Sequence, residues 1–208
     1  MRLALALVVL TMAVPPTSSA WADSGAVVAP PVATRALLKG LRASGRAEAA
    51  VRLSRRDPVT GRASVLRGRL ALELAGLARL DLEDGERLTL RPDGGDWLQP
   101  ATRQLVRAGT RSAAGVLVWW TALVADRGGA LRERPVGPGA YELVTAGTEE
   151  VAQRVELDAR GLPRRLLVAV SPEERLEYHL SRWRFVRPRG RADFALEPPV
   201  GFELVELP

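Results

Sequence analysis

The sequence predicts a mainly β domain in which about eleven antiparallel strands form a sheet and short helical segments cover its apolar face. The first observation is the alternation of apolar and polar residues with period two, which runs over residues 47–104 and resumes from residue 140. The second is the series of glycine- and proline-rich turns between these runs, which is typical of consecutive hairpins. The third is that only residues 33–45 and 112–125 have helical spacing of apolar residues instead.

Residues 1–22 have the organisation of a secretory signal peptide. Arg2 is the positive end, residues 3–12 are the apolar stretch, and small residues follow up to Ala22. The apolar stretch is well short of the roughly 20 residues that span a bilayer. We expect cleavage after Ala22, which leaves a single exported domain of residues 23–208. The alternative is an uncleaved signal that serves as a membrane anchor; a lipid anchor is excluded because no cysteine follows the stretch.

The N-terminal helix is expected within residues 33–45, where Thr34 is placed to cap it and Gly45 to end it. After it comes the clearest strand of the chain, residues 66–74, which alternates leucines on one face with charged residues on the other, the signature of a half-buried antiparallel strand. Shorter strands at residues 79–83 and 87–91 repeat the pattern. The apolar residues that we expect to form the core, and to bind a ligand if that core is hollow, are Leu70, Leu72, Leu74, Leu80, Leu82 and Trp97.

Residues 112–125 are nearly all apolar and interrupt the strands. One helical stripe of this segment carries Val116, Trp119, Trp120 and Leu123. The segment is too short to cross a membrane, and these side chains either line a ligand pocket or pack as simple core. Because a large sheet must cover its apolar face, either a curved sheet closes around the helices and leaves an apolar lumen, or a solid sandwich forms. The pattern fits both.

Composition narrows the classes of function. The 208 residues include no cysteine and one histidine, His179. Thiolate metal sites and cysteine nucleophiles are therefore excluded, and a histidine metal site or a Ser/His/Asp triad has almost no residues to draw on. The acidic pairs at residues 149–150 and 173–174 lie in turns and point apart, which makes them poor candidates for concerted acid–base work. We expect no catalytic residue, no metal and no cofactor.

The net charge of +6 comes almost entirely from arginine, since Lys39 is the only lysine among 30 basic residues. The arginines are scattered among acids and lack the interleaved aromatic residues of a nucleic-acid stripe. This favours a solvated surface of mixed charge and no nucleic-acid partner. The alternative is a basic surface that steers the protein towards anionic lipid headgroups or nucleic acid.

Three motifs together resemble the periplasmic lipoprotein carriers of the LolA family. An Asp-Gly turn, a Trp-containing strand, a Pro and a Gln occur in the family's order at Asp93, Gly94, Trp97, Pro100 and Gln104. Residues 157–163 look like the family's Asp-x-x-Gly hairpin, and residues 194–205 are similar to its Phe…Pro-x-Gly-x-acidic-Val ending. With the export signal and the N-terminal helix, the resemblance covers nearly the whole mature chain.

The resemblance implies an open, incomplete antiparallel β-barrel whose concave apolar face is covered by short helices, with residues 112–125 as a lid. It also implies a non-catalytic periplasmic carrier that shields the acyl chains of lipoproteins, or of a related amphiphile, on the way to the outer membrane. The partners would be a release complex in the inner membrane and an acceptor in the outer membrane, with transient membrane contact and a monomeric carrier. The family's latch arginine is replaced here by Leu74. An interaction or sensor module that binds an envelope regulator is the alternative on the same fold.

We expect the exported protein to begin at Asp23, because the Ala-Trp-Ala ending of the signal supplies the small residues that signal cleavage requires. The measurement is N-terminal sequencing of the protein recovered from a periplasmic extract. A recovered protein that still carries Met1 would contradict the prediction.

Overall fold

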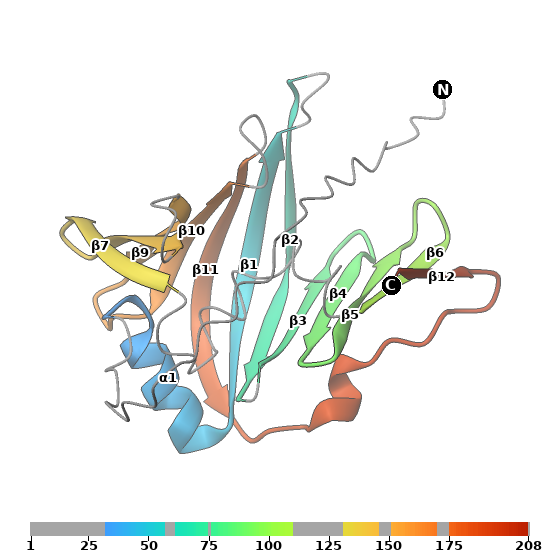
Figure 1. The fold of residues 1–208 in the computed structure, drawn as a ribbon, viewed down its shortest axis with the longest axis horizontal. Coiled ribbons are helices and arrows are strands. Elements are labelled where there is room, and N and C mark those ends of the chain that lie inside the picture. The colour runs from blue at the N-terminus through green and yellow to red at the C-terminus, as the bar shows by residue number, and fades with distance from the viewer. Residues whose placement is uncertain are drawn as a thin grey trace, which may run out of the picture.

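The computed structural model describes residues 32–56, 61–74, 76–109, 131–145, 151–169 and 175–207. In this part of the chain, one α-helix and a short 3-10 helix accompany a single twelve-stranded sheet (Figure 1). In chain order the elements are α1 (Val32–Ser44), β1 (Arg46–Arg56), β2 (Ala63–Glu73), β3 (Leu77–Leu82), β4 (Arg87–Arg91), β5 (Gly94–Gln99), β6 (Gln104–Gly109), β7 (Leu131–Gly137), β8 (Ala140–Thr145), β9 (Val151–Leu157), β10 (Pro163–Ala169), β11 (Arg175–Val186), η1 (Arg191–Phe194) and β12 (Glu203–Leu207).

The strand order is β12-β6-β5-β4-β3-β2-β1-β11-β10-β9-β8-β7. Two series of hairpins, β1 to β6 and β7 to β11, join through the antiparallel pairing of β1 with β11. The last strand, β12, adds to β6 in parallel. The order has two different end strands, so the sheet is open. The expected mainly β, open antiparallel architecture is confirmed, with one strand more than the expected eleven.

The N-terminal helix forms where the sequence predicts it, but its cap is different. Thr34 is not the cap, because it is the third residue of α1 and is buried. The helix start is instead held by Glu133 of β7, whose two carboxylate oxygens each accept a hydrogen bond of 2.7 Å, from the backbone N–H groups of Val32 and Ala33. A carboxylate at this position satisfies two free N–H groups and interacts favourably with the helix dipole. Gly45 ends the helix at φ +90°, as expected.

The strand parity predicted for β2 holds in its centre and fails at its end. Leu70 and Leu72 are 1% and 0% exposed, whereas Leu74 is 38% exposed. The core position predicted for Leu74 is wrong because β2 ends at Glu73, so the next residue enters a turn and leaves the pleat. Glu73 lies on the charged face of β2, as expected, but is buried there.

The burial of charge on this face has one cause, the segment between β11 and β12. In Figure 1 it runs from β11 past the ends of the strands, through η1, and back to β12 beside β6. The Asp96 carboxylate of β5 is buried under it and accepts hydrogen bonds from Arg91 at 2.7 Å, from Arg107 at 3.0 Å and from the N–H of Leu196 at 3.0 Å. Burial alone raises the pKa of Asp96, but these three donors outweigh it and hold the pKa below its ordinary value.

We expect Asp96→Asn to lower the free energy of unfolding at pH 7 by about 3 kcal/mol, because it leaves the largely buried Arg91, and the more exposed Arg107, without their counter-charge. The folded-state pKa is lowered, so the stabilisation is complete above the unfolded pKa near 4 and is lost as the pH falls through the folded value. Urea unfolding at pH 7 and at pH 3 measures both effects. Asp93→Asn, at a mostly exposed carboxylate, is the control and should change little at either pH.

Candidate functional site

The candidate site is one face of the sheet, on which a single apolar cluster crosses ten strands, from β6 to β8 in sheet order. We call it the apolar face. Its buried strand residues are Ala47, Ala49, Val51, Leu53, Leu70, Leu72, Ala78, Leu80, Leu82, Leu88, Leu90, Leu143, Val155, Leu166, Val168, Tyr178, Leu180 and Trp183. Trp97 of β5 and Ala108 of β6 pack against them and are partly buried.

Strand register explains why these residues meet. One row across β1 to β5 reads, in sheet order, Ala49, Leu70, Leu80, Leu88 and Trp97. The next row reads Ala47, Leu72, Ala78 and Leu90. Side chains directly opposite each other on one face lie about 5 Å apart at Cβ, so each row is a continuous apolar contact. The structure therefore brings together five of the six strand residues predicted for the site and leaves out Leu74.

Leu82, the last of the five, lies at a point where two strands approach closely. It pairs with Gly68 of β2. A Cβ atom on Gly68 would lie 2.3 Å from the carbonyl oxygen of Asp81 and 2.9 Å from a methyl group of Leu82. Only glycine fits at position 68 without displacing β3. Gly68 therefore permits the close pairing of β2 and β3 that aligns their leucines.

The helix α1 covers one half of the apolar face. Ala33, Leu37 and Leu41 form a stripe with spacing of four residues and are fully buried in the same cluster. The helix packs on β1, β9, β10 and β11, and Figure 1 places it beside this half of the sheet. The leucines of β2, β3 and β4 continue the face on the other side of β1.

The four helical residues predicted for the site, Val116, Trp119, Trp120 and Leu123, lie outside the described residues, as does the whole predicted lid at residues 112–125. Their role therefore stays a prediction.

Two polar groups interrupt the apolar face, the indole N–H of Trp97 and the amide of Gln153, and only the first has a hydrogen-bond partner among the described residues. The indole N–H of Trp97 donates to Glu86 at 2.8 Å, and Glu86 also accepts from Arg55 at 3.5 Å. These contacts place charge at the rim of the face. Nearby, burial is the main reason that the pKa of Tyr178 is raised, and the negative charge of Glu86 adds to it.

Gln153 of β9 is the exception. It is 2% exposed and pairs with Leu143 on one side and Val168 on the other, both members of the apolar face. In the part of the chain that the structure describes, neither its amide nitrogen nor its amide oxygen has a hydrogen-bond partner. The indole of Trp183, on the same face, donates to the carbonyl of Pro163 at 2.8 Å. The buried amide of Gln153 is therefore an uncompensated cost to the fold.

The sequence interpretation missed Gln153, although a signal was present. In the β9 run Val-Ala-Gln-Arg-Val-Glu-Leu, the glutamine holds the parity of the buried Val155, where an apolar residue is expected. It also missed the capping role of Glu133, which had no signal because the contact joins residues about one hundred positions apart.

The described residues offer little for metal or acid–base chemistry. His179 is half exposed, and its imidazole lies 2.8 Å from the carboxylate of Glu177. The hydrogen bond from Arg165 is the largest influence on the pKa of Glu177 and lowers it. Burial raises this pKa and His179 lowers it, so the pKa of Glu177 lies below its ordinary value. Among the described residues, no three acidic or histidine side chains are grouped to hold a metal ion. Within the same residues, no helix has the length and apolarity needed to cross a bilayer.

No family model matches the chain, and the search of curated proteins finds no match. Among solved structures, the chain is similar to an uncharacterised conserved protein from Thermus thermophilus, with 15% identity over 84% of this chain and 97% of that one and a TM-score of 0.49. It is similar to a LolA superfamily protein from Nitrosomonas europaea, with 10% identity over 78% and 97% and a TM-score of 0.42. A third is a DUF1329 family protein from Desulfovibrio piger, with 11% identity over 79% and 94% and a TM-score of 0.45. One of these similar structures is thus a LolA superfamily protein by name, the family that the sequence motifs resemble.

Proposed function

We propose that this protein is a non-catalytic carrier which shields the acyl chains of lipoproteins, or of a related amphiphile, against the apolar face of its sheet. It is exported to the periplasm, where it receives its cargo from a release complex in the inner membrane and passes it to an acceptor in the outer membrane. It acts as a monomer with transient membrane contact. This agrees with the signal peptide predicted at residues 1–22.

One observation carries the proposal. The apolar face extends over ten strands, while the single described helix that packs on it lies on four of them. A sheet needs a cover over its whole apolar face, and the leucine rows of β2 to β4 beyond this helix are 8% exposed or less, so a bound cargo would replace their present cover. An acyl chain is a suitable cover, because each methylene removed from water contributes about 0.8 kcal/mol, so a sixteen-carbon chain contributes on the order of 12 kcal/mol.

Gln153 supports a cargo with a polar group next to its apolar chain. Its amide both donates and accepts hydrogen bonds, and it lies among apolar side chains without a partner in the described part of the chain. The ester or amide carbonyl by which an acyl chain is joined to its headgroup or peptide would accept from the amide nitrogen. A buried glutamine that is costly in the empty protein is then satisfied by the cargo.

The direct test is to extract the purified protein with organic solvent and identify the extracted molecules by mass spectrometry. The carrier proposal expects acyl-chain lipids or acylated peptides in a stoichiometric amount. If the extract contains no such molecules and the same protein binds an envelope regulator, the sensor or interaction module is favoured instead.

We expect Leu72→Glu to abolish binding of a neutral long-chain probe, pyrene-labelled hexadecanol, because it buries a carboxylate without a partner in the middle of the apolar face. Arg69→Glu, three positions earlier on the opposite face of β2, is the matched control and should leave probe binding unchanged. If the Leu72→Glu protein does not fold, Leu82→Asn at the end of β3 tests the same face. Probe fluorescence and circular dichroism report binding and folding separately. Equal effects of the changes at Leu72 and Arg69 would refute the assignment of the two faces.

We expect Gln153→Leu to raise the free energy of unfolding of the empty protein by about 1–2 kcal/mol, since it removes an unsatisfied buried amide. The same variant should bind an acyl ester more weakly than wild type while binding a plain alkane equally well. Arg154→Leu, the exposed neighbour on the other face of β9, should change neither property. Thermal unfolding and competition for the pyrene probe measure the two effects. A less stable Gln153→Leu protein would mean that the amide has a partner in the empty state.

A further inference from the structure

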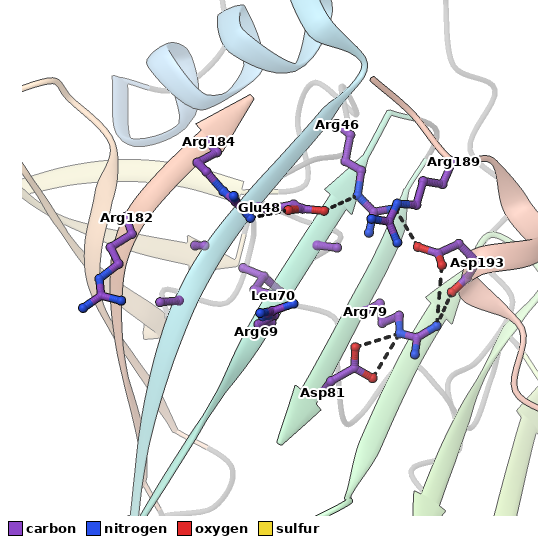
Figure 2. A pocket seen from close by; sticks show the side chains of 13 residues that line it. Arg46, Glu48, Arg69, Leu70, Arg79, Asp81, Arg182, Arg184, Arg189 and Asp193 are labelled. Carbon is purple, nitrogen blue, oxygen red and sulfur yellow. Dashed lines mark hydrogen bonds and ion pairs between the residues drawn. The ribbon is translucent and has the colours of Figure 1, made fainter. Parts of the chain in front are cut away.

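The opposite face of the sheet contains a cavity of about 460 Å³ that the carrier function does not use. We call it the arginine cavity. Its charged lining is Arg46, Glu48, Arg69, Arg79, Asp81, Arg182, Arg184, Arg189 and Asp193. Figure 2 shows Arg182 and Arg184 from β11 on one side, Arg46, Arg79 and Arg189 on the other, and Arg69 of β2 between them. A volume of this size is typical of a site for a small ligand.

Strand register creates the hollow. One row across the face reads, in sheet order, Arg184, Glu48, Ala71 and Arg79, and the next reads Ser181, Ala50, Arg69 and Asp81. Ala50 and Ala71 line the cavity with methyl groups only, between long side chains on both sides. Neighbouring strands are about 4.8 Å apart, so the two small residues leave a depression that the flanking arginines surround.

The three carboxylates that line the cavity are already engaged by three of its arginines. Glu48 accepts from Arg46 and Arg184, each at 3.0 Å. Asp81 pairs with Arg79 at 2.9 Å. The remaining acid, Asp193, lies 2.7 Å from Arg46 and 3.8 Å from Arg79.

Arg46 in particular is immobilised. Burial lowers its pKa, but Asp193, Glu73 and Glu48 outweigh burial and raise the pKa above the ordinary value. Its guanidinium also lies 5.6 Å from the centre of the Phe194 ring. Arg46 and its acids are therefore a rigid wall of the cavity and not a free binding group.

The other three arginines, Arg69, Arg182 and Arg189, have side chains without a carboxylate partner among the described residues. The carboxylate nearest to Arg69 by register is Asp81, and it is engaged by Arg79 and, at 3.7 Å, by Arg87. Natural surfaces usually intersperse charges of both signs. Three unpaired guanidinium groups around one cavity, with six arginines against three acids in its lining, produce a concentrated positive potential.

Backbone geometry at Arg182 is a second, independent observation. The register between β1 and β11 shifts between Glu48 and Ala50, so that Ala49 faces two residues of β11. This is a β-bulge, and Arg182 within it has φ +55°, in the left-handed region that disfavours side chains. The bulge keeps both Arg182 and Arg184 at the cavity while Trp183 points into the apolar face. A glycine would relieve the backbone, yet an arginine occupies the position.

We infer that the arginine cavity binds a phosphate group. A phosphate monoester carries close to two negative charges, a phospholipid phosphodiester carries one, and both present acceptor oxygens to guanidinium groups from more than one direction, whereas a carboxylate offers one charge and two oxygens in a single plane. The flat guanidinium fork matches phosphate geometry with two parallel hydrogen bonds. The group belongs either to a free phosphorylated small molecule or to a phospholipid headgroup. This site is separated from the apolar face by the thickness of the sheet, so it does not depend on the carrier proposal.

The test is titration of the purified protein with glycerol 3-phosphate and with pyrophosphate by calorimetry at low ionic strength, together with sedimentation on phosphatidylglycerol and phosphatidylcholine vesicles. Arg182→Gly removes one guanidinium and relieves the left-handed backbone, so we expect about tenfold weaker phosphate binding without loss of thermal stability. Arg69→Gln should weaken binding to a similar extent.

The matched control is Arg103→Gly. Arg103 has the same φ of +55°, but it lies in the turn before β6 and does not line the cavity. The change removes the same charge with the same backbone relief, and we expect less than a twofold effect on phosphate binding. Binding of the soluble phosphates identifies a small molecule as the source, and binding of phosphatidylglycerol vesicles alone identifies a lipid headgroup.

Three results would overturn the inference. The first is no binding of any phosphate probe. The second is an equal loss of binding in Arg182→Gly and Arg103→Gly, which means that net charge alone attracts the phosphate. The third is binding of a polyglutamate peptide, but of no phosphate, that depends on Arg182, because the occupant is then an acidic protein segment.

Discussion

The pairing of β1 with a neighbour on each side is the constraint on which the rest of the molecule depends. Ala47 pairs with Leu72 of β2 and Phe185 of β11, while Val51 pairs with Gly68 and Leu180. Because side chains alternate with period two, a slip of one residue in either pairing would turn the leucines of a whole hairpin series to the opposite face. The two registers together therefore align two separate hairpin series into one apolar face. The bulge at Arg182 is the local adjustment that keeps this alignment over the full length of β11.

Two kinds of cover follow from having two different faces. On the apolar face, α1 supplies leucines over four strands, and Glu133 of the edge strand β7 fixes its start. On the charged face, the segment between β11 and β12 is held by buried carboxylates. Glu73 accepts from Arg46 and from the N–H groups of Arg189 and Gly190, and Asp96 accepts from the N–H of Leu196. Hydrophobic burial thus covers one side, and charge-assisted hydrogen bonds cover the other.

The two proposed sites lie on different faces of the sheet and therefore do not compete. A ligand with apolar chains needs a surface that excludes water, and the leucine rows of β2 to β4 supply it. An anionic group needs cations that are not already neutralised, and Arg69, Arg182 and Arg189 supply them where small side chains open the charged face at Ala50 and Ala71. Because one sheet separates the sites, changes to residues of opposite parity on a single strand, such as Leu72 and Arg69, act on different sites. The chemistry of each face can therefore be tested alone.

Alternation along the chain was enough to predict most of the strands, the helix at residues 33–45 and the inward faces of β2 and β3, because these depend on neighbours two to four positions apart. It did not predict β7, which lies before residue 140, where the alternation resumes. It was not enough for Leu74, where the strand ends one residue too early for the pattern to apply. Contacts between distant segments were decided only by the tertiary structure. The cap from Glu133 on α1, the burial of Glu73 and the gathering of arginines from four strands and the segment after β11 all join residues far apart in sequence. The type of a residue determines what its side chain can bind. Whether its charge is neutralised depends on its distance from other charges, and strand register sets that distance between segments that no local sequence pattern relates.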